Sequence, residues 1–265
     1  MTKPTLFLVG AGPGDAELIT LKAVKVIQSA DVVLYDALVN PELLDYCRPD
    51  CVQRFVGKRM GCHALSQEEI NALIIDESHR HNHIVRLKGG DPSVFGRAYE
   101  EMLTAQSAGM HVEVIPGISS AIAVPQAAMI PITCRGVSES FWVTTGTTRS
   151  GDISSDIRLA AQSTATVIIL MAMSKLEKIM EIFAHYGKAK TPVAIIQEGC
   201  TPNQKTVIGT VNDIFFRAQE AAVANPAIVV VGEVVNNRLD NREMIHAMER
   251  MQCLAMDKDG RNAAL

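Results

Sequence analysis

The chain of 265 residues has 48% hydrophobic and 20% charged residues, which is ordinary for a globular protein with one large or two modest domains. The net charge of −4 argues against a general nucleic-acid binder. No apolar run approaches the roughly 20 residues that span a bilayer, and the N-terminus shows no cleavable signal pattern. We therefore expect a cytoplasmic protein with no membrane partner. The six cysteines fit neither a disulfide framework nor a common zinc spacing, so we expect no metal.

The first strand and its glycine turn point to a small-molecule ligand. Leu6–Val9 is a short apolar run, typical of a strand covered on both faces, and the sequence G-A-G-P-G-D follows it. The turn resembles a dinucleotide fingerprint, but Asp15 stands where the third glycine is required. Pro13 removes a backbone donor and stiffens the loop, which suits a flat or neutral group better than a pyrophosphate. A nicotinamide oxidoreductase is therefore a disfavoured alternative.

The next turns carry polar groups. We expect a helix over residues 20–30 and a strand over residues 31–36. The strand ends in Asp36, which is either a base at a strand end or a turn-forming aspartate. A second glycine turn precedes Lys58 and Arg59, which either bind an anion or are simply solvated. The sequence Ser66–Glu69 predicts a capping box at the start of a helix.

Residues 84–97, I-V-R-L-K-G-G-D-P-S-V-F-G-R, are the most informative stretch. The strand pattern places Arg86 and Lys88 on the face opposite the apolar side chains. The two glycines that follow let the backbone approach a ligand at the carboxyl edge of a sheet, and Asp91 adds an acceptor there. We expect two neighbouring ligands, one held by backbone and one by charge. A plain turn with solvated cations is the alternative.

Repeated strand–turn–helix units predict a mostly parallel sheet with its ligands at the carboxyl ends of the strands. A helix follows Arg97, and Ser119 and Ser120 lie at the start of the helix after the strand over residues 111–115. We predict that residues 130–140 form a linker. A second α/β pattern then has a helix capped by Ser174–Glu177 and strands over residues 141–145, 166–171, 193–197, 206–209 and 227–231.

These patterns predict an α/β protein with a ligand cleft between two α/β domains. We place the N-terminal domain at residues 1–135, the C-terminal domain at residues 136–237 and a helical tail at residues 238–265. In the tail, Met244, Met248 and Met251 fall on one helical stripe. We expect this stripe to pack on its own domain rather than on a second subunit.

Several motifs occur in the order found in the tetrapyrrole methylases: V-G-A-G-P-G-D, Y-D-A-L-V, V-G-K-R, R-L-K-G-G-D-P, V-F-G-R, V-I-P-G-I-S-S-A and P-A-I-V-V-V-G. The chain resembles this family over residues 5–235, and most of all its members that methylate uroporphyrinogen III. The resemblance implies S-adenosylmethionine-dependent methylation of that substrate at C2 and C7, giving precorrin-2 for sirohaem or cobalamin synthesis and S-adenosylhomocysteine as the second product. It also implies two α/β domains with the cofactor site in the cleft between them, and a homodimer.

The resemblance also implies roles for individual residues. Asp36 would be the proton acceptor and Lys58 the proton donor, while Arg97 and Glu100 would handle the substrate. Arg59 and Arg135 would bind substrate carboxylates. Contacts with the cofactor are implied for Pro13, Gly89, Gly90, Asp91, Val94, Ser119, Ser120, Met171, Gly199 and Ala227.

The chain departs from the family pattern in places that concern the acceptor pocket. Ser93 and Val94 replace the usual F-I, Cys134 replaces the histidine of T-H-R, and residues 144–148 read T-T-G-T-T where T-G-H is usual. Another methylase of the same fold is therefore an alternative, acting on a later corrin intermediate, diphthamide or ribosomal RNA. The net charge counts against the RNA version, so we expect no nucleic-acid partner. A non-catalytic nucleotide sensor is a further alternative.

Overall fold

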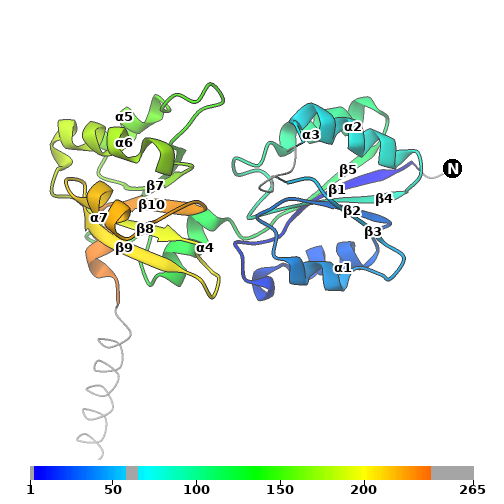
Figure 1. Cartoon of the computed structure of the whole chain (residues 1–265), viewed down its shortest axis with the longest axis horizontal. Coiled ribbons are helices and arrows are strands. Elements are labelled where there is room, and N and C mark those ends of the chain that lie inside the picture. The colour runs from blue at the N-terminus through cyan, green and yellow to red at the C-terminus, as the bar shows by residue number, and fades with distance from the viewer. Residues whose placement is uncertain (1–2, 58–64, 240–265) are drawn as a thin grey trace, which may run out of the picture.

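The computed structural model describes residues 3–57 and 65–239, which form two α/β lobes, each built on a five-stranded sheet (Figure 1). The predicted α/β class with two such units is confirmed. Lys58, Arg59 and the methionine stripe of the tail lie outside the described residues, and the predictions made for them stay predictions.

The first lobe contains a fully parallel sheet in the order β3-β2-β4-β1-β5. One core lies between this sheet and α1, and a second lies between its other face and α2 and α3. The short edge strand β3 was not predicted, because half of its residues are polar. The bounds are β1 Thr5–Gly10, α1 Leu21–Gln28, β2 Val32–Tyr35, β3 Val52–Phe55, α2 Gln67–Ser78, β4 His83–Lys88, α3 Ala98–Ser107 and β5 His111–Ile115.

The second lobe contains a mixed sheet in the order β6-β7-β10-β8-β9. Only the β6–β7 pair is parallel, and β10 runs antiparallel to both β7 and β8. Helices α5, α6 and α7 cover one face of the sheet. The bounds are β6 Phe141–Thr145, α5 Asp156–Gln162, β7 Thr166–Leu170, α6 Leu176–Phe183, β8 Pro192–Gln197, β9 Lys205–Thr210, α7 Ile214–Glu220 and β10 Ala227–Val231.

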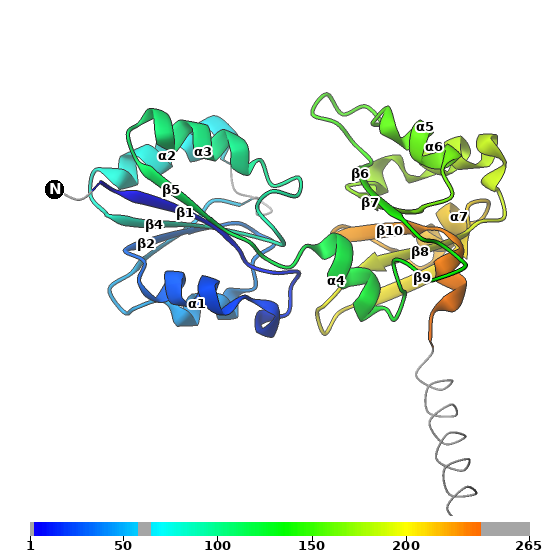
Figure 2. The same cartoon turned by 180° about the vertical axis from the view of Figure 1, so that it is seen from behind.

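Helix α4, Ser120–Ala127, covers the other face of the second sheet, although it follows the last strand of the first lobe (Figure 2). Its Ala121 and Val124 pack with Ile168 of β7 and Ile228 of β10 in one apolar core. This packing favours a boundary near Pro116 over the one predicted at residue 135. The extent of each autonomous domain stays a prediction.

Two predicted helix starts had different outcomes. At α2, Ser66 Oγ accepts from Glu69 N at 3.1 Å and Glu69 Oε2 accepts from Ser66 N at 2.6 Å, so the capping box is confirmed. At α6 the cap predicted from Ser174–Glu177 is wrong. Ser174 lies in a short 3-10 turn, and the N-cap residue Lys175 makes no side-chain cap.

Three glycine backbones meet where β1, β4 and β5 end. A Cβ on Gly10 would lie 2.5 Å from Gly117 Cα and 2.8 Å from Gly90 O. A Cβ on Gly117 would lie 2.4 Å from Gly90 O. Every atom that a Cβ on Gly10 or Gly117 would meet belongs to the backbone. A side chain at either position therefore cannot fit without moving the strand ends apart.

We therefore predict that Gly10→Ala lowers the free energy of unfolding by about 3 kcal/mol, the upper part of the range for overpacked sites. The matched control is Gly109→Ala, where a Cβ would meet nothing within 4 Å and only the φ of +80° opposes alanine. That strain costs about 1 kcal/mol. Urea unfolding followed by circular dichroism compares the two variants, and equal losses would contradict the steric argument.

Candidate functional site

The glycine turns of the first lobe are tied together by hydrogen bonds. Gly90 N donates to Gly12 O at 2.7 Å, and Gly12 N donates to Gly90 O at 3.2 Å. Asp91 extends the link to the turn after β5, because its Oδ2 accepts from Gly117 N at 3.0 Å and its Oδ1 accepts from Ser93 N at 2.8 Å. The backbone around Pro13 is thereby fixed against residues 90–91.

The remaining first-lobe candidates lie around this link. A Cβ on Gly89 would lie 2.7 Å from Leu38 Cβ, which places the turn after β4 beside the turn after β2. Val94 N donates to Asp91 O at 3.2 Å. Ser120 Oγ is 3.9 Å from the place a Cβ on Gly90 would occupy, and Ser119 caps α4 through Ala121 N.

The candidates of the second lobe lie along one edge of its sheet. The register pairs Ala227 with Gln197 and Ile228 with Leu170, so the start of β10 lies between the carboxyl ends of β7 and β8. Met171 follows β7 with a φ of 54° and 49% of its surface exposed. Gly199 follows β8 and packs against α4, where a Cβ would lie 2.3 Å from Val124 Cγ1.

The two groups of turns meet at the junction of the lobes. A Cβ on Gly14 would lie 2.8 Å from Thr201 Cγ2 and 3.3 Å from Gly199 O, and Asn40 Nδ2 donates to Gly14 O at 2.9 Å. The structure therefore brings the strand-end turns of both lobes together. The ten residues predicted to contact a cofactor lie in these turns or, for Ser120 and Ala227, at the first position of the adjoining helix or strand.

Asp36 and the Arg97–Glu100 pair add charge to the first-lobe side. Asp36 Oδ1 accepts from Leu38 N at 3.1 Å. Arg97, at φ 56° before α3, donates from Nε and Nη2 to Glu100 at 2.8 and 2.6 Å. These hydrogen bonds hold the pKa of Glu100 below its ordinary value against the opposing effect of burial, and the charges of Arg97, Arg149 and Lys88 lower it further.

Arg149 is a candidate that the sequence reasoning missed. Its effect on the pKa of Glu100 places a cation of the second lobe within electrostatic range of the first-lobe pair. The segment between β6 and α5, which contains Arg149, extends toward the first lobe in Figure 1. The departure from T-G-H in this segment was the available signal. Arg135, by contrast, lies exposed on the loop between α4 and β6.

The two cations of β4, Arg86 and Lys88, are buried. Arg86 and Lys88, which the strand pattern placed on the face opposite the apolar side chains, are only 3% and 5% exposed and bind Glu101 beneath the turns. Burial lowers the pKa of Lys88, as does the charge of Arg86, while Glu101 and Asp36 oppose this change. Glu101 was not predicted, because its burial depends on how α3 packs on the sheet.

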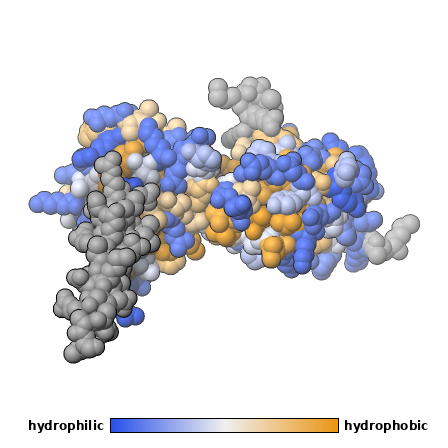
Figure 3. Space-filling view, turned by 90° about the horizontal axis from the view of Figure 1, so that it is seen from below, coloured by the Kyte–Doolittle hydropathy of each residue, from blue (hydrophilic) through white to orange (hydrophobic). Residues whose placement is uncertain are grey.

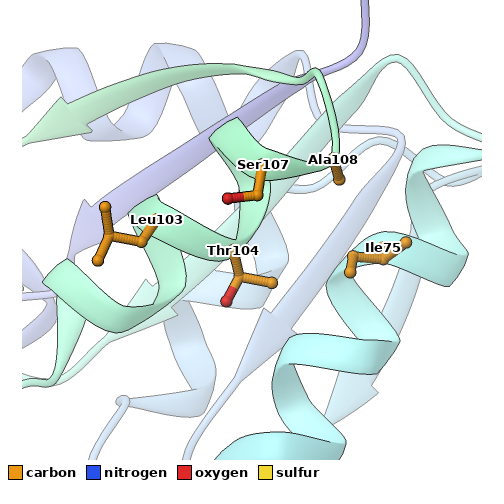
Figure 4. Close-up of a pocket in the computed structure, with 5 residues that line it drawn as sticks. All are labelled: Ile75, Leu103, Thr104, Ser107 and Ala108. Carbon is orange, nitrogen blue, oxygen red and sulfur yellow. The ribbon is translucent and has the colours of Figure 1, made fainter.

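A depression of about 420 Å³ lies elsewhere, between α2 and α3, and is lined by Ile75, Leu103, Thr104, Ser107 and Ala108 (Figure 4). These residues lie in the later parts of the two helices or, for Ala108, directly after α3. In a parallel sheet the crossover helices run back along the strands, so this depression lies toward the amino ends of the strands. It is therefore separate from the glycine turns.

No metal centre emerges within residues 3–57 and 65–239, where no group of three or more His, Cys, Asp or Glu side chains could hold an ion. Cys47 and Cys51 are free thiols, and burial raises the pKa of Cys51 to about 12.

Comparison with known proteins gives a consistent picture. Residues 5–214 match the family model of the Tetrapyrrole (Corrin/Porphyrin) Methylases. The chain is 47% identical over 233 residues to a uroporphyrinogen-III C-methyltransferase of Methanocaldococcus jannaschii, covering 87% of this chain and 96% of that one. It is 41% identical over 239 residues to a Bacillus subtilis protein of the same name, covering 89% of this chain but only 50% of the relative.

The fold agrees with a solved structure as well. The uroporphyrin-III C-methyl transferase of Thermus thermophilus, complexed with S-adenyl homocysteine, superposes with a TM-score of 0.75 at 35% identity and covers 88% of this chain and 99% of that one. The family match, the relatives and the superposition all extend across both lobes, and the chain belongs to the tetrapyrrole methylase family.

Proposed function

We propose that this chain catalyses the S-adenosylmethionine-dependent C-methylation of uroporphyrinogen III at C2 and C7 to give precorrin-2, for sirohaem or cobalamin synthesis. The observation behind the proposal is that the strand-end turns of the two lobes meet at Gly14, in a chain that aligns with 96% of a uroporphyrinogen-III C-methyltransferase. The nicotinamide alternative is weaker, because Asp15 is occupied as the N-cap of a short 3-10 helix that follows the first glycine turn.

The turns suit a ligand that is held by backbone rather than by charge. A Cβ on Gly10 or Gly117 would collide with the backbone of the neighbouring turns, and Gly90 has the positive φ that favours glycine, so the strand ends expose backbone amides and carbonyls rather than side chains. S-adenosylmethionine supplies a methyl group on a sulfonium cation and carries no phosphate. We assign its contacts to Pro13, Gly89, Gly90, Asp91, Val94, Ser119, Ser120, Met171, Gly199 and Ala227.

In the proposed reaction the residues mainly position the partners, because methyl transfer to carbon needs a short, aligned approach. The electron pair of a pyrrole carbon forms the new carbon–carbon bond as the carbon–sulfur bond breaks and its pair returns to sulfur. The ring then loses a proton, for which Asp36 is the proposed acceptor, and Lys58 is the proposed donor elsewhere on the ring.

The methyl acceptor, uroporphyrinogen III, carries eight carboxylates. Arginine is well suited to bind them, because its planar guanidinium can bind a carboxylate through two donors. Arg97 is bonded to Glu100, and the charge of Arg149, from the second lobe, lowers the pKa of the same carboxyl group. We propose that both contact substrate carboxylates, together with Arg59 and Arg135, and that Glu100 holds Arg97 in place until a substrate carboxylate replaces it.

The direct test is to incubate the protein with S-adenosylmethionine and uroporphyrinogen III under reducing conditions and to analyse the product by mass spectrometry. We expect a gain of two methyl groups, because both ring positions are methylated in turn. Unchanged uroporphyrinogen III together with measurable cofactor binding would refute the proposal. That result would favour either the sensor or a methylase for another acceptor, which later corrin intermediates in the same assay would identify.

Asp91 tests the cofactor assignment. Asp91→Ala removes the hydrogen bond from Gly117 N that ties the turns of β4 and β5 together, and the bond from Ser93 N within the first of these turns. We predict that it weakens binding of S-adenosylhomocysteine at least about tenfold, since a loss of roughly 1.4 kcal/mol corresponds to that factor. Titration calorimetry measures this. The control Asp76→Ala, at the end of α2, breaks an exposed ion pair with Arg80 and should leave the affinity unchanged.

We further propose a homodimer that works in the cytoplasm. Apolar side chains on and beside α4 are exposed, among them Ile118, Ile122 and Met129. Hydrophobic surface also gathers near the junction of the lobes on the side seen in Figure 3, and such patches commonly mark interfaces. None of the described helices is long and apolar enough to cross a membrane.

Sedimentation equilibrium should give twice the chain mass, and Ile122→Glu should shift the mass toward one chain because it places a charge on the apolar patch. A monomer at micromolar concentration in the unmodified protein would contradict the assembly. Recovery of the protein outside the cytoplasmic fraction of cells would contradict the location.

A further inference from the structure

Four charged side chains form a cluster beneath the turns of the first lobe: Asp36 after β2, Arg86 and Lys88 on β4, and Glu101 on α3. Glu101 is fully buried, and the two cations are nearly so. Charges this deep are costly unless each is paired, so their arrangement is tightly constrained.

Glu101 accepts hydrogen bonds from three side chains. Its Oε1 accepts from Arg86 Nε at 3.2 Å and from Gln67 Nε2 at 3.2 Å, and both of its oxygens accept from Lys88 Nζ at 3.0 Å. Since the carboxylate has no freedom to rotate away from these partners, it holds the Nε side of the Arg86 guanidinium in one place.

The rest of the Arg86 guanidinium is fixed as well. Its Nη1 donates to Leu34 O of the neighbouring strand β2 at 3.3 Å and to Leu87 O of its own strand at 3.0 Å. Its Nη2 points to the remaining acid of the cluster and lies 3.5 Å from Asp36 Oδ2. Arg86 therefore links the core to a carboxylate at the strand end, while Leu38 N holds the other carboxylate oxygen.

The balance of charge within the cluster also requires the Asp36 carboxylate. Two buried cations face a single buried carboxylate, and Asp36, whose side chain is 25% exposed, supplies the second negative charge. A side chain that both completes a buried cluster and reaches the open edge of the sheet has its position dictated by the core. Packing of α3 on the sheet is thereby coupled to the geometry of the strand end.

We propose that Arg86, held by Glu101, is a positioning residue that fixes the Asp36 carboxylate for proton removal from the methylated ring. This inference rests on the proposed function, in which Asp36 is the acceptor. The competing explanation is a structural one, in which the cluster only joins β4 to α3. The two explanations differ in whether Arg86 still matters once the Asp36 carboxylate is absent.

A double-mutant cycle separates them. Four proteins are compared for methylation of uroporphyrinogen III: the parent, Arg86→Gln, Asp36→Asn and the double variant. General-base groups contribute about 10²–10⁴-fold, so Asp36→Asn should lower kcat at least about 100-fold. We expect Arg86→Gln to lower kcat about tenfold or more while the KM for S-adenosylmethionine stays within about twofold. The double variant should then be no slower than Asp36→Asn, again within about twofold.

If the double variant is slower than Asp36→Asn by the full factor that Arg86→Gln costs alone, the effects are additive and the positioning role is overturned. If Arg86→Gln does not fold, Glu101→Gln takes its place in the same cycle, because it keeps the side-chain shape and removes only the charge. Arg86→Lys should also lower kcat, since a single ammonium cannot reach Glu101, the backbone carbonyls and Asp36 together. Full activity of this lysine variant would likewise overturn the proposal.

Arg54→Gln is the matched control. Arg54 on β3 pairs with Glu77, another fully buried glutamate, and belongs to a separate cluster with His81. Its loss should lower the thermal unfolding midpoint and leave kcat within about twofold of the parent. A parent protein that does not consume uroporphyrinogen III would defeat the proposed function, whereas parent turnover with an additive cycle would defeat only the role of Arg86.

Discussion

The close approach of three glycine backbones at the ends of β1, β4 and β5 is the constraint on which the rest of the structure depends. With Gly10 and Gly117 in contact and Gly90 bonded to Gly12, the strand ends form a surface of amides and carbonyls. A Cβ on Gly10 or Gly117 would push these strand ends apart, and Gly14, which faces Thr201 of the second lobe, lies only a few residues from Gly10. The position of one lobe against the other therefore depends on residues that have no side chain.

Beneath this surface the first lobe buries charge on the strand that carries its most informative turn. The side chains of Arg86 and Lys88 leave β4 on the face covered by α2 and α3, where Glu101 neutralises them in part. Removing one partner from such a cluster leaves an uncompensated charge, which is far more costly than loss of a surface pair. The turn after β4 is therefore fixed on two sides, by backbone contacts above and by ion pairs below.

Sequence reasoning succeeded where the determinants are local. The strand ends, the capping box of Ser66 and the cap at Ser119 follow from residue types within a few positions of each other. It failed where tertiary packing decides. Neither the antiparallel β10 nor the position of α4 on the second sheet leaves a local signal, and the burial of Arg86 and Lys88 depends on the packing of α3 over the sheet. Ser174 has the pattern of a cap, yet the chain enters α6 through a 3-10 turn.

Two arginine–glutamate pairs lie close together in this lobe and differ in what they can do. Arg97 and Glu100 are about half exposed, and surface pairs of this kind contribute little to stability, so a substrate carboxylate can replace Glu100 on the guanidinium at small cost. Arg86 and Glu101 are buried, and replacing one partner by a ligand group would leave the other charge unpaired in the core. The chain thus has one pair suited to exchange with a polycarboxylate and one suited to hold Asp36 still. Adjacent glutamates on α3 acquire these different roles only because one faces solvent and the other faces the sheet.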